Sequence, residues 1–307
     1  FKQKTAYEIR LSLVGSEMCI RDSLYTASPA GIFLATVVSD LFKTKIGFTA
    51  ADPSLAWRAV FLTGLVPAFV AVLIRLKVKE PPMWKQTKEG GQVRELFSPH
   101  FRRRTIGGLS MAVIALLSWW CCFAFLPSIA ERLAEGDLAL KGRFVKLGTN
   151  AFSLGGLVGT LLTLPIAVYL GRRWMFGLYF AVSAIAVWTA FGASVTPEQR
   201  MYLMFFVGLG VFGVFGAFTF YLPELFPTRL RSTGAGFCYN TGRFIAAAGP
   251  FLVGAVNRSA DGATKQEELA SLLTTVSWVA VFPAVGVALV LLGVGVETKG
   301  RTLAEHG

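Results

Sequence analysis

Charged residues are scarce in this sequence. Only 16% of its 307 residues are Asp, Glu, Lys or Arg, whereas soluble domains carry about 25%. Hydrophobic residues make up 54%, and the mean hydropathy is +0.57. The low charge argues against an ordinary water-soluble enzyme, and the high apolar content excludes intrinsic disorder. This composition is typical of a chain that crosses a membrane several times.

Residues that serve metal and redox chemistry are also few. The two histidines are His100 and His306, and none of the four cysteines has a CxxC or Cys/His spacing. A membrane-embedded acyl or glycosyl transferase would need clusters of acids or histidines, and neither DxD nor HxxxxD occurs. The nucleotide-binding pattern GxxxxGK[ST] is absent as well. We therefore predict no metal site, no cofactor, no use of ATP and no enzymatic activity.

Acidic residues are outnumbered, with 18 against 30 basic residues and a formal charge of +12. In a membrane protein this excess belongs in cytoplasmic loops, so it does not indicate nucleic-acid binding. The most basic connection covers residues 77–104, and we place it in the cytoplasm. Alternation of sides then puts Arg172, Arg173, Arg229, Arg231 and the C-terminus in the cytoplasm too.

Long apolar runs dominate the remainder of the chain. The runs are longer than the strands of a membrane barrel and lack strict alternation, so they predict helices. The sequence therefore predicts an all-α membrane protein with about eight transmembrane helices, at residues 24–42, 57–76, 106–129, 147–170, 174–193, 201–222, 233–256 and 272–295.

Residues 1–23, FKQKTAYEIRLSLVGSEMCIRDS, differ from everything that follows. They are polar and lack the apolar core of a secretory signal peptide. Their text resembles translated sequencing-adapter read-through. We expect this tail to be such an artefact, the alternative being a genuine cytoplasmic tail.

The stretch from Tyr221 to Gly236, YLPELFPTRLRSTGAG, is the most informative motif. It places Glu224 and Arg231 on either side of a helix-breaking proline, and a carboxylate and a guanidinium can pair bidentately at a membrane surface. We predict a cytoplasmic charge network that stabilises one conformation, formed by Glu224, Arg229, Arg231, Arg172 and Arg173. A solvated loop is the alternative interpretation.

This stretch resembles the turn between the tenth and eleventh helices of major facilitator superfamily (MFS) transporters, especially the sugar-porter-like branch. Three further stretches are similar to family motifs in the right order: KEPPMW at 79–84, GRR at 171–173 and ETKGRTL at 297–303. The sequence departs from the family at Val168 and Tyr169, where an acid and a base are usual, and at Pro82 and Met83.

The resemblance implies a twelve-helix fold of two halves, of which this chain matches helices 5–12. Residues 24–77 would be the last two helices of the N-terminal half, and 78–105 the basic central loop. Residues 106–295 would be the C-terminal six-helix half, followed by a tail at 296–307. We therefore expect an N-terminally truncated transporter that is inactive as it stands.

The resemblance also implies secondary transport of a small polar solute, an organic anion or a sugar, by alternating access. Proton symport is the expected mechanism. A facilitated-diffusion uniporter and a non-transporting membrane scaffold or receptor of the same fold are the alternatives. The expected partners are a small-molecule substrate, protons and the lipid bilayer, and we expect a monomer in a plasma membrane or bacterial inner membrane.

Candidate substrate contacts come from polar and aromatic residues inside the runs. Arg243 is the only charged residue within the seventh run, where charge is costly and usually functional. Asn240 lies one turn away and can share its face. An aromatic wall can bind a sugar ring or an organic acid, which adds Trp119, Trp120 and Tyr221. For Arg243 a structural role, and for the tryptophans lipid or helix packing, stay open.

Overall fold

The computed structural model describes residues 27–28, 30–41, 53–77, 91–256 and 264–299. It separates two compact units, of which one contains residues 30–90 and the other residues 91–307 together with 1–29. The predicted tail artefact at 1–23 and the loop motif at 79–84 lie outside the described residues. The predicted domain boundaries stay predictions.

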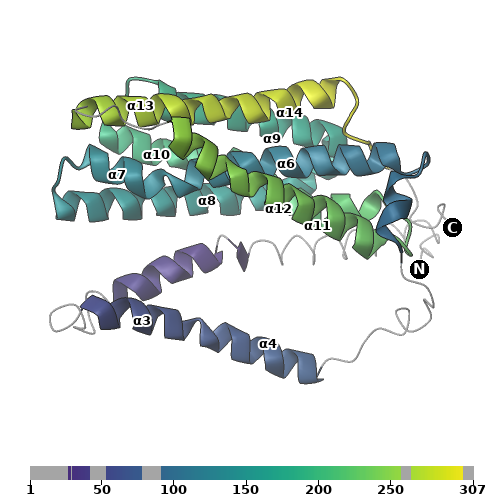
Figure 1. Ribbon diagram of the computed structural model, residues 1–307, viewed down its shortest axis with the longest axis horizontal. Coiled ribbons are helices and arrows are strands. Elements are labelled where there is room, and N and C mark those ends of the chain that lie inside the picture. Colours follow the sequence, from purple (N-terminus) through teal and green to yellow (C-terminus); the bar gives the residue numbers. More distant parts are fainter. Residues whose placement is uncertain (1–26, 29, 42–52, 78–90, 257–263, 300–307) are drawn as a thin grey trace, which may run out of the picture. The chain divides into compact units, whose positions relative to one another are not determined.

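The described residues of the smaller unit form helices. Its described elements are the helix Ala30–Leu41, α3 (Pro53–Thr63) and α4 (Leu65–Lys77) (Figure 1). The helices α3 and α4 meet at Gly64, and residues Arg58–Lys77 have a hydropathy of 2.2, high enough for a membrane span. Basic residues Arg75 and Lys77 end α4, where cations suit the negative end of a helix.

The larger unit is a helical bundle. In chain order its elements are η1 (Val93–Phe97), α6 (Arg102–Ala124), α7 (Leu126–Leu133), α8 (Leu138–Leu170), α9 (Arg172–Val187), η2 (Trp188–Gly192), α10 (Pro197–Val207), η3 (Gly208–Phe212), α11 (Phe215–Glu224), α12 (Arg231–Val256), α13 (Lys265–Ser277), η4 (Trp278–Ala280) and α14 (Val281–Leu291). Side-chain caps start several of them: Asp137 accepts from Ala139 N, and Thr196 and Thr264 each complete a capping box.

Continuous helical segments of membrane-spanning length account for most of this unit. Over the described residues of both units, six helices are long and apolar enough to cross a membrane. The helix α12 is not among them, because Arg231, Arg243 and several polar residues interrupt its sequence. Its 26 residues still measure about 39 Å. The predicted all-helical membrane architecture is confirmed, whereas the first of the eight predicted runs is described only in part.

The predicted ends of two helices were wrong. The helix α8 begins at Leu138, well before residue 147, because the Asp137 cap and the charged residues after it belong to the helix although they are not apolar. The third predicted run continues through α7 to Leu133 rather than ending at 129. Hydropathy marks the apolar centre of a helix and not its polar ends.

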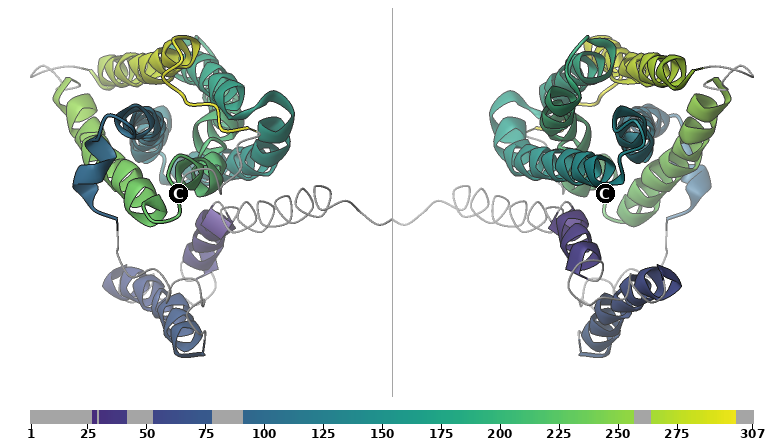
Figure 2. Two further views of the ribbon diagram at one scale, coloured as in Figure 1. Left: turned by 90° about the vertical axis from the view of Figure 1, so that its right-hand side faces the viewer. Right: turned by 90° about the vertical axis from the view of Figure 1, so that its left-hand side faces the viewer.

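Close packing joins the helices of the bundle. Figure 2 looks along it and shows α6 between α12 and the remaining helices. Gly155 and Gly159 of α8 form a GxxxG pair and lie against the backbone of Phe205 in α10 and of Leu209 in η3. The pair therefore serves close helix contact. A core rich in Phe fills the space between α6, α9 and α11.

Candidate functional site

A bidentate ion pair joins the start of α9 to the end of α11. Arg172 Nη2 donates to Glu224 Oε1 at 2.9 Å, and Arg172 Nε donates to Glu224 Oε2 at 3.2 Å. The two side chains are only 10% and 17% exposed. A pair withdrawn from water in this way holds its geometry far better than a surface pair.

The tail after α14 adds a second carboxylate. Glu297 accepts hydrogen bonds from the backbone N–H groups of Arg172 and Arg173, both at 3.0 Å, and so caps the N-terminus of α9. Burial alone would raise the pKa of the Glu297 carboxyl, but the N–H groups of Lys299, Arg173 and Arg172 lower it below its ordinary value. Thr298 donates from its hydroxyl to Glu224, which connects the cap to the ion pair.

Gly171 makes this cap possible. Its φ is +91°, in the left-handed region that glycine adopts without strain. A Cβ at this position would lie 2.7 Å from Glu297 Oε2. The glycine of the GRR motif therefore allows the carboxylate to approach the end of α9.

Two more contacts fasten the tail. Arg173 donates to the carbonyls of Val290 and Leu291, both at 2.8 Å, at the C-terminal end of α14. Val296 N donates to Tyr221 Oη at 3.1 Å. Tyr221, predicted as a substrate contact, is fully buried in the core and its hydroxyl holds the tail.

The remaining predicted members of the network lie in separate contacts. Arg229 pairs with Glu95 of η1, and this pairing lowers the pKa of the Glu95 carboxyl. Arg231 Nη2 contacts Thr228 Oγ1 at 3.4 Å. The structure pairs Glu224 with Arg172 at the start of α9, and it places Arg231 in the first turn of α12.

Trp119 belongs to an aromatic cluster on α6, α8 and the α10–α11 segment. It stacks on Phe123, with centroids 5.5 Å apart, and meets Phe212 and Phe215 edge-on at 6.2 Å. Within the described residues its buried Nε1 has no hydrogen-bond partner. Trp120 packs edge-on against Trp119 and is itself exposed.

Polar atoms on α8 flank the same cluster, and sequence reasoning missed them. Phe152 contacts Phe123 at 5.2 Å, and its neighbours along α8 include Ser153 and Asn150. Their side-chain oxygens are buried without a hydrogen-bond partner in the described part of the chain. Such orphaned atoms are rare in native structures and call for an explanation. Small polar residues in an apolar run carry too little sequence signal to be singled out.

The candidate residues Arg243 and Asn240 are both exposed on α12. Arg243 Cζ lies 5.8 Å from the ring centroid of Tyr239, and that ring meets Phe218 of α11 at 6.0 Å. Asn240 Nδ2 donates to the carbonyl of Gly236 at 2.9 Å. That Asn240 and Arg243 share one face of α12 stays a prediction from their spacing.

The apolar helices of membrane-spanning length define a multi-pass helical membrane protein. The sequence model of the Major Facilitator Superfamily matches residues 23–250. The chain belongs to this family, which confirms the resemblance found in the motifs. Membership in a transporter family also confirms the prediction that the protein is not an enzyme.

Several curated proteins are similar to this chain. A probable 4-methylmuconolactone transporter of Cupriavidus pinatubonensis is 30% identical over 74% of this chain and 52% of its own length. A cis,cis-muconate transport protein of Acinetobacter baylyi is 24% identical over 66% and 50%. An inner membrane metabolite transport protein of Escherichia coli is 26% identical over 65% and 49%. The chain spans about half the length of these relatives.

Proposed function

We propose that the complete protein is a secondary transporter that moves a small organic anion across a bacterial inner membrane by alternating access. The names of two relatives, the transporters of 4-methylmuconolactone and of cis,cis-muconate, support an organic acid more than a sugar. The name of the inner-membrane relative supports the location. The single observation that carries the substrate class is the placement of Arg243.

Arg243 sits deep along a membrane-length helix. At about 1.5 Å per residue it lies about 18 Å from Arg231, near the middle of α12. Its guanidinium is exposed, and Tyr239 provides an aromatic face beside it. A charge at this depth is costly in lipid and is usually found facing a water-filled cavity or a partner group. A substrate carboxylate is the partner that the exposed fork fits best.

The aromatic cluster provides a second group of substrate contacts. Trp119 and Trp120 offer ring faces, and the indole Nε1 of Trp119 offers an unused donor. Asn240 adds an exposed amide on the face of Arg243. The buried oxygens of Asn150 and Ser153 complete the polar groups that a bound solute or water would satisfy.

The charge network has a mechanical role in this proposal. Its hydrogen bonds tie α9, α11 and the tail after α14 to one another, and all of these elements belong to the larger unit. We therefore assign it to keeping the six-helix unit rigid while it moves against the rest of the transporter. Alternating access by rocking requires such rigid halves.

Proton coupling is the second part of the proposal. Proton symport needs a titratable carboxylate that reaches the transport pathway. Glu224 is tied to Arg172 and Thr298, which suits a structural role, so we assign the proton-carrying group to residues outside the described spans. Collapse of the pH gradient with a protonophore should abolish accumulation of the substrate. Uptake that does not depend on the pH gradient would identify a uniporter instead.

Uptake of radiolabelled cis,cis-muconate by cells expressing the complete protein tests the substrate class. Arg243→Gln should lower kcat/KM at least about tenfold, because a charge-assisted bidentate contact is lost. Arg243→Lys keeps the charge but not the fork and should recover only part of the rate. Arg143→Gln, at an exposed position near the start of α8, is the matched control. Wild-type uptake by Arg243→Gln, or transport of sugars but of no organic acid, would contradict the proposal.

A further inference from the structure

Three buried polar atoms within two membrane-length helices have no hydrogen-bond partner among the residues that the structure describes. They are Nε1 of Trp119 on α6, and Oδ1 of Asn150 and Oγ of Ser153 on α8. An unbonded polar atom away from water costs free energy, so each of the three calls for a group that bonds to it. Trp119 and Asn150 keep part of their surface exposed, which gives a ligand an approach.

Contacts with two rings place Trp119 and this part of α8 beside each other. Trp119 stacks on Phe123 and meets the ring of Phe212, and Phe152 contacts the same two rings at 5.2 and 6.3 Å. Ser153 follows Phe152 in the chain. The orphaned atoms on α6 and α8 therefore border one aromatic cluster.

The spacing along α8 agrees with this placement. Ser153 lies three residues from Asn150 and three from Gly156, so it neighbours both on the helix surface. A Cβ at Gly156 would lie 2.9 Å from the ring of Phe212, the ring that Trp119 also meets. This part of α8 is thus turned toward the cluster.

The three orphaned atoms differ in what they can bond. The indole N–H of Trp119 only donates, Oδ1 of Asn150 accepts, and the hydroxyl of Ser153 does either. A hydroxyl group matches this set because it accepts one bond and donates another. A carboxylate only accepts, so it would leave Oδ1 of Asn150 without a donor.

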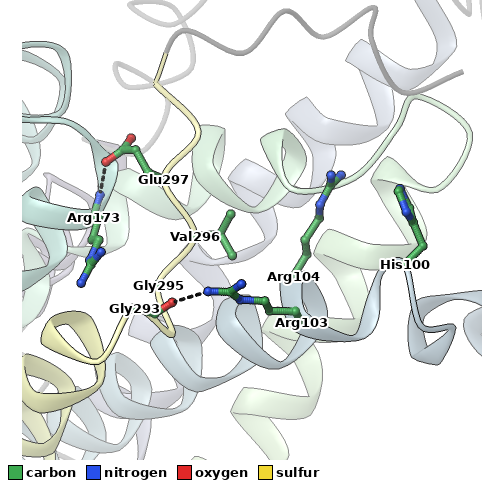
Figure 3. Close-up of a pocket in the computed structure, with 8 residues that line it drawn as sticks. All are labelled: His100, Arg103, Arg104, Arg173, Gly293, Gly295, Val296 and Glu297. Carbon is green, nitrogen blue, oxygen red and sulfur yellow. Dashed lines mark hydrogen bonds between the residues drawn. The ribbon is translucent and has the colours of Figure 1, made fainter.

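The cluster lies in stretches of the chain without charge. Residues 105–130, 147–171 and 201–223 contain no Asp, Glu, Lys or Arg. At the charge-network end, Figure 3 shows Arg173 bonded to Glu297 and Arg103 bonded to the carbonyl of Gly293, so these cations fasten the tail after α14. An ionised group without a counter-charge is costly away from water. A ligand group at the cluster should therefore be uncharged.

A series of aromatic contacts joins the cluster to Arg243. Phe215 meets Trp119 at 6.2 Å, Phe218 meets Phe215 at 5.7 Å, and Tyr239 meets Phe218 at 6.0 Å. Arg243 Cζ lies 5.8 Å from the ring centroid of Tyr239. A cationic end and an uncharged polar end are thus connected by apolar rings.

We propose that the cluster binds a hydroxyl group of the solute at the end opposite its carboxylate, so that the transported compound is a hydroxy monocarboxylate. This inference rests on the proposed function, in which Arg243 binds the carboxylate. Trp119 Nε1 donates to the hydroxyl oxygen, the hydroxyl donates to Asn150 Oδ1, and Ser153 makes the third bond.

Isothermal titration calorimetry of the complete protein in detergent tests this site. The probes are ω-hydroxy acids of four to eight carbons, with the fatty acids and dicarboxylates of the same lengths. At the length that binds best, the hydroxy acid should bind about three- to tenfold more tightly than the fatty acid, the factor that a hydrogen bond contributes. Equal affinities of these two, or tightest binding of the dicarboxylate, would overturn the proposal.

Ser153→Ala and Ser118→Ala form a matched pair of substitutions. Both remove a buried hydroxyl, but Ser118 Oγ already donates to the carbonyl of Ile114 at 2.8 Å. Ser153→Ala should weaken binding of the hydroxy acid about threefold and leave the fatty acid unchanged, whereas Ser118→Ala should change neither. An equal loss for both acids in Ser153→Ala would show a structural role and contradict the proposal.

Arg243→Gln separates this inference from the proposed function in the same assay. It should weaken the hydroxy acid and the fatty acid alike, because both carry the carboxylate. If it weakens neither, the assignment of Arg243 in the proposed function is wrong, whereas the hydroxyl site is wrong only if the preference for the hydroxy acid is absent or does not depend on Ser153.

Discussion

The Arg172–Glu224 pair combines a desolvated position with bidentate geometry. Both carboxylate oxygens of Glu224 accept from the guanidinium, and Thr298 donates to one of them. Removing one partner leaves the other charge without compensation, which typically costs about 3 kcal/mol or more. We therefore predict that Glu224→Gln lowers the melting temperature of the purified chain in detergent by several degrees.

The Arg229–Glu95 pair provides the matched comparison for that loss. Its side chains are 45% and 31% exposed, and exposed pairs contribute about 0–1 kcal/mol. Glu95→Gln should thus change the melting temperature little. If both substitutions shift it equally, burial is not what makes the Arg172 pair stabilising.

Glu297 predicts a pH dependence of stability. Its pKa is held below the ordinary value of 4.5 by backbone N–H groups, so the folded state binds this proton more weakly than the unfolded state. The stabilisation is fully present above pH 4.5 and is lost as the pH falls through the lower pKa of the folded state. Thermal unfolding should show Glu297→Gln less stable than wild type at pH 7, with the difference shrinking at pH 4 and below. The exposed Glu135→Gln control should show no such convergence, and a constant difference would contradict the role of the cap.

The helix α8 allows a paired test of close packing. A Cβ at Gly159 would collide with the backbone of Leu209 and Gly213, whereas a Cβ at Gly142 would meet no atom within 4 Å. Gly159→Ala should destabilise the chain by about 1–3 kcal/mol through overpacking. Gly142→Ala, in the same helix, should stabilise it by up to about 1 kcal/mol, because alanine is the better helix former. Urea or thermal unfolding in detergent measures both, and destabilisation by both would show that helix propensity is not the deciding factor at Gly142.

Sequence patterns predicted the helices well where apolar residues repeat, and less well at their polar ends. The start of α8 at Leu138 depends on one side-chain cap, which hydropathy does not register. For the site, two of the four motifs identified Arg172 and Glu224, but not that these two residues pair with each other. Their separation in the chain leaves the pairing to tertiary structure, as it does the capping of α9 by Glu297.

The contacts also determine which ends of the helices lie together. The α8–α9 turn, the end of α11 and the tail after α14 all contribute to the charge network. The start of α6 contacts the same tail, where Arg103 donates to Gly293 O. They must therefore lie on the same side of the membrane. The Lys and Arg residues near this side outnumber those near the other, and basic loops remain in the cytoplasm.

We therefore predict that the charge network faces the cytoplasm. The test uses a background in which all four native cysteines are replaced. Ser194→Cys places a thiol in the turn between η2 and α10, and Ser232→Cys places one in the first turn of α12, at the opposite end of the bundle. Both serines are exposed, so a maleimide can reach both new thiols once the membrane is permeabilised. A membrane-impermeant maleimide should label Ser194→Cys in intact cells, and Ser232→Cys only after permeabilisation. The reverse pattern would show that the basic loops and the charge network lie on the outer side of the membrane.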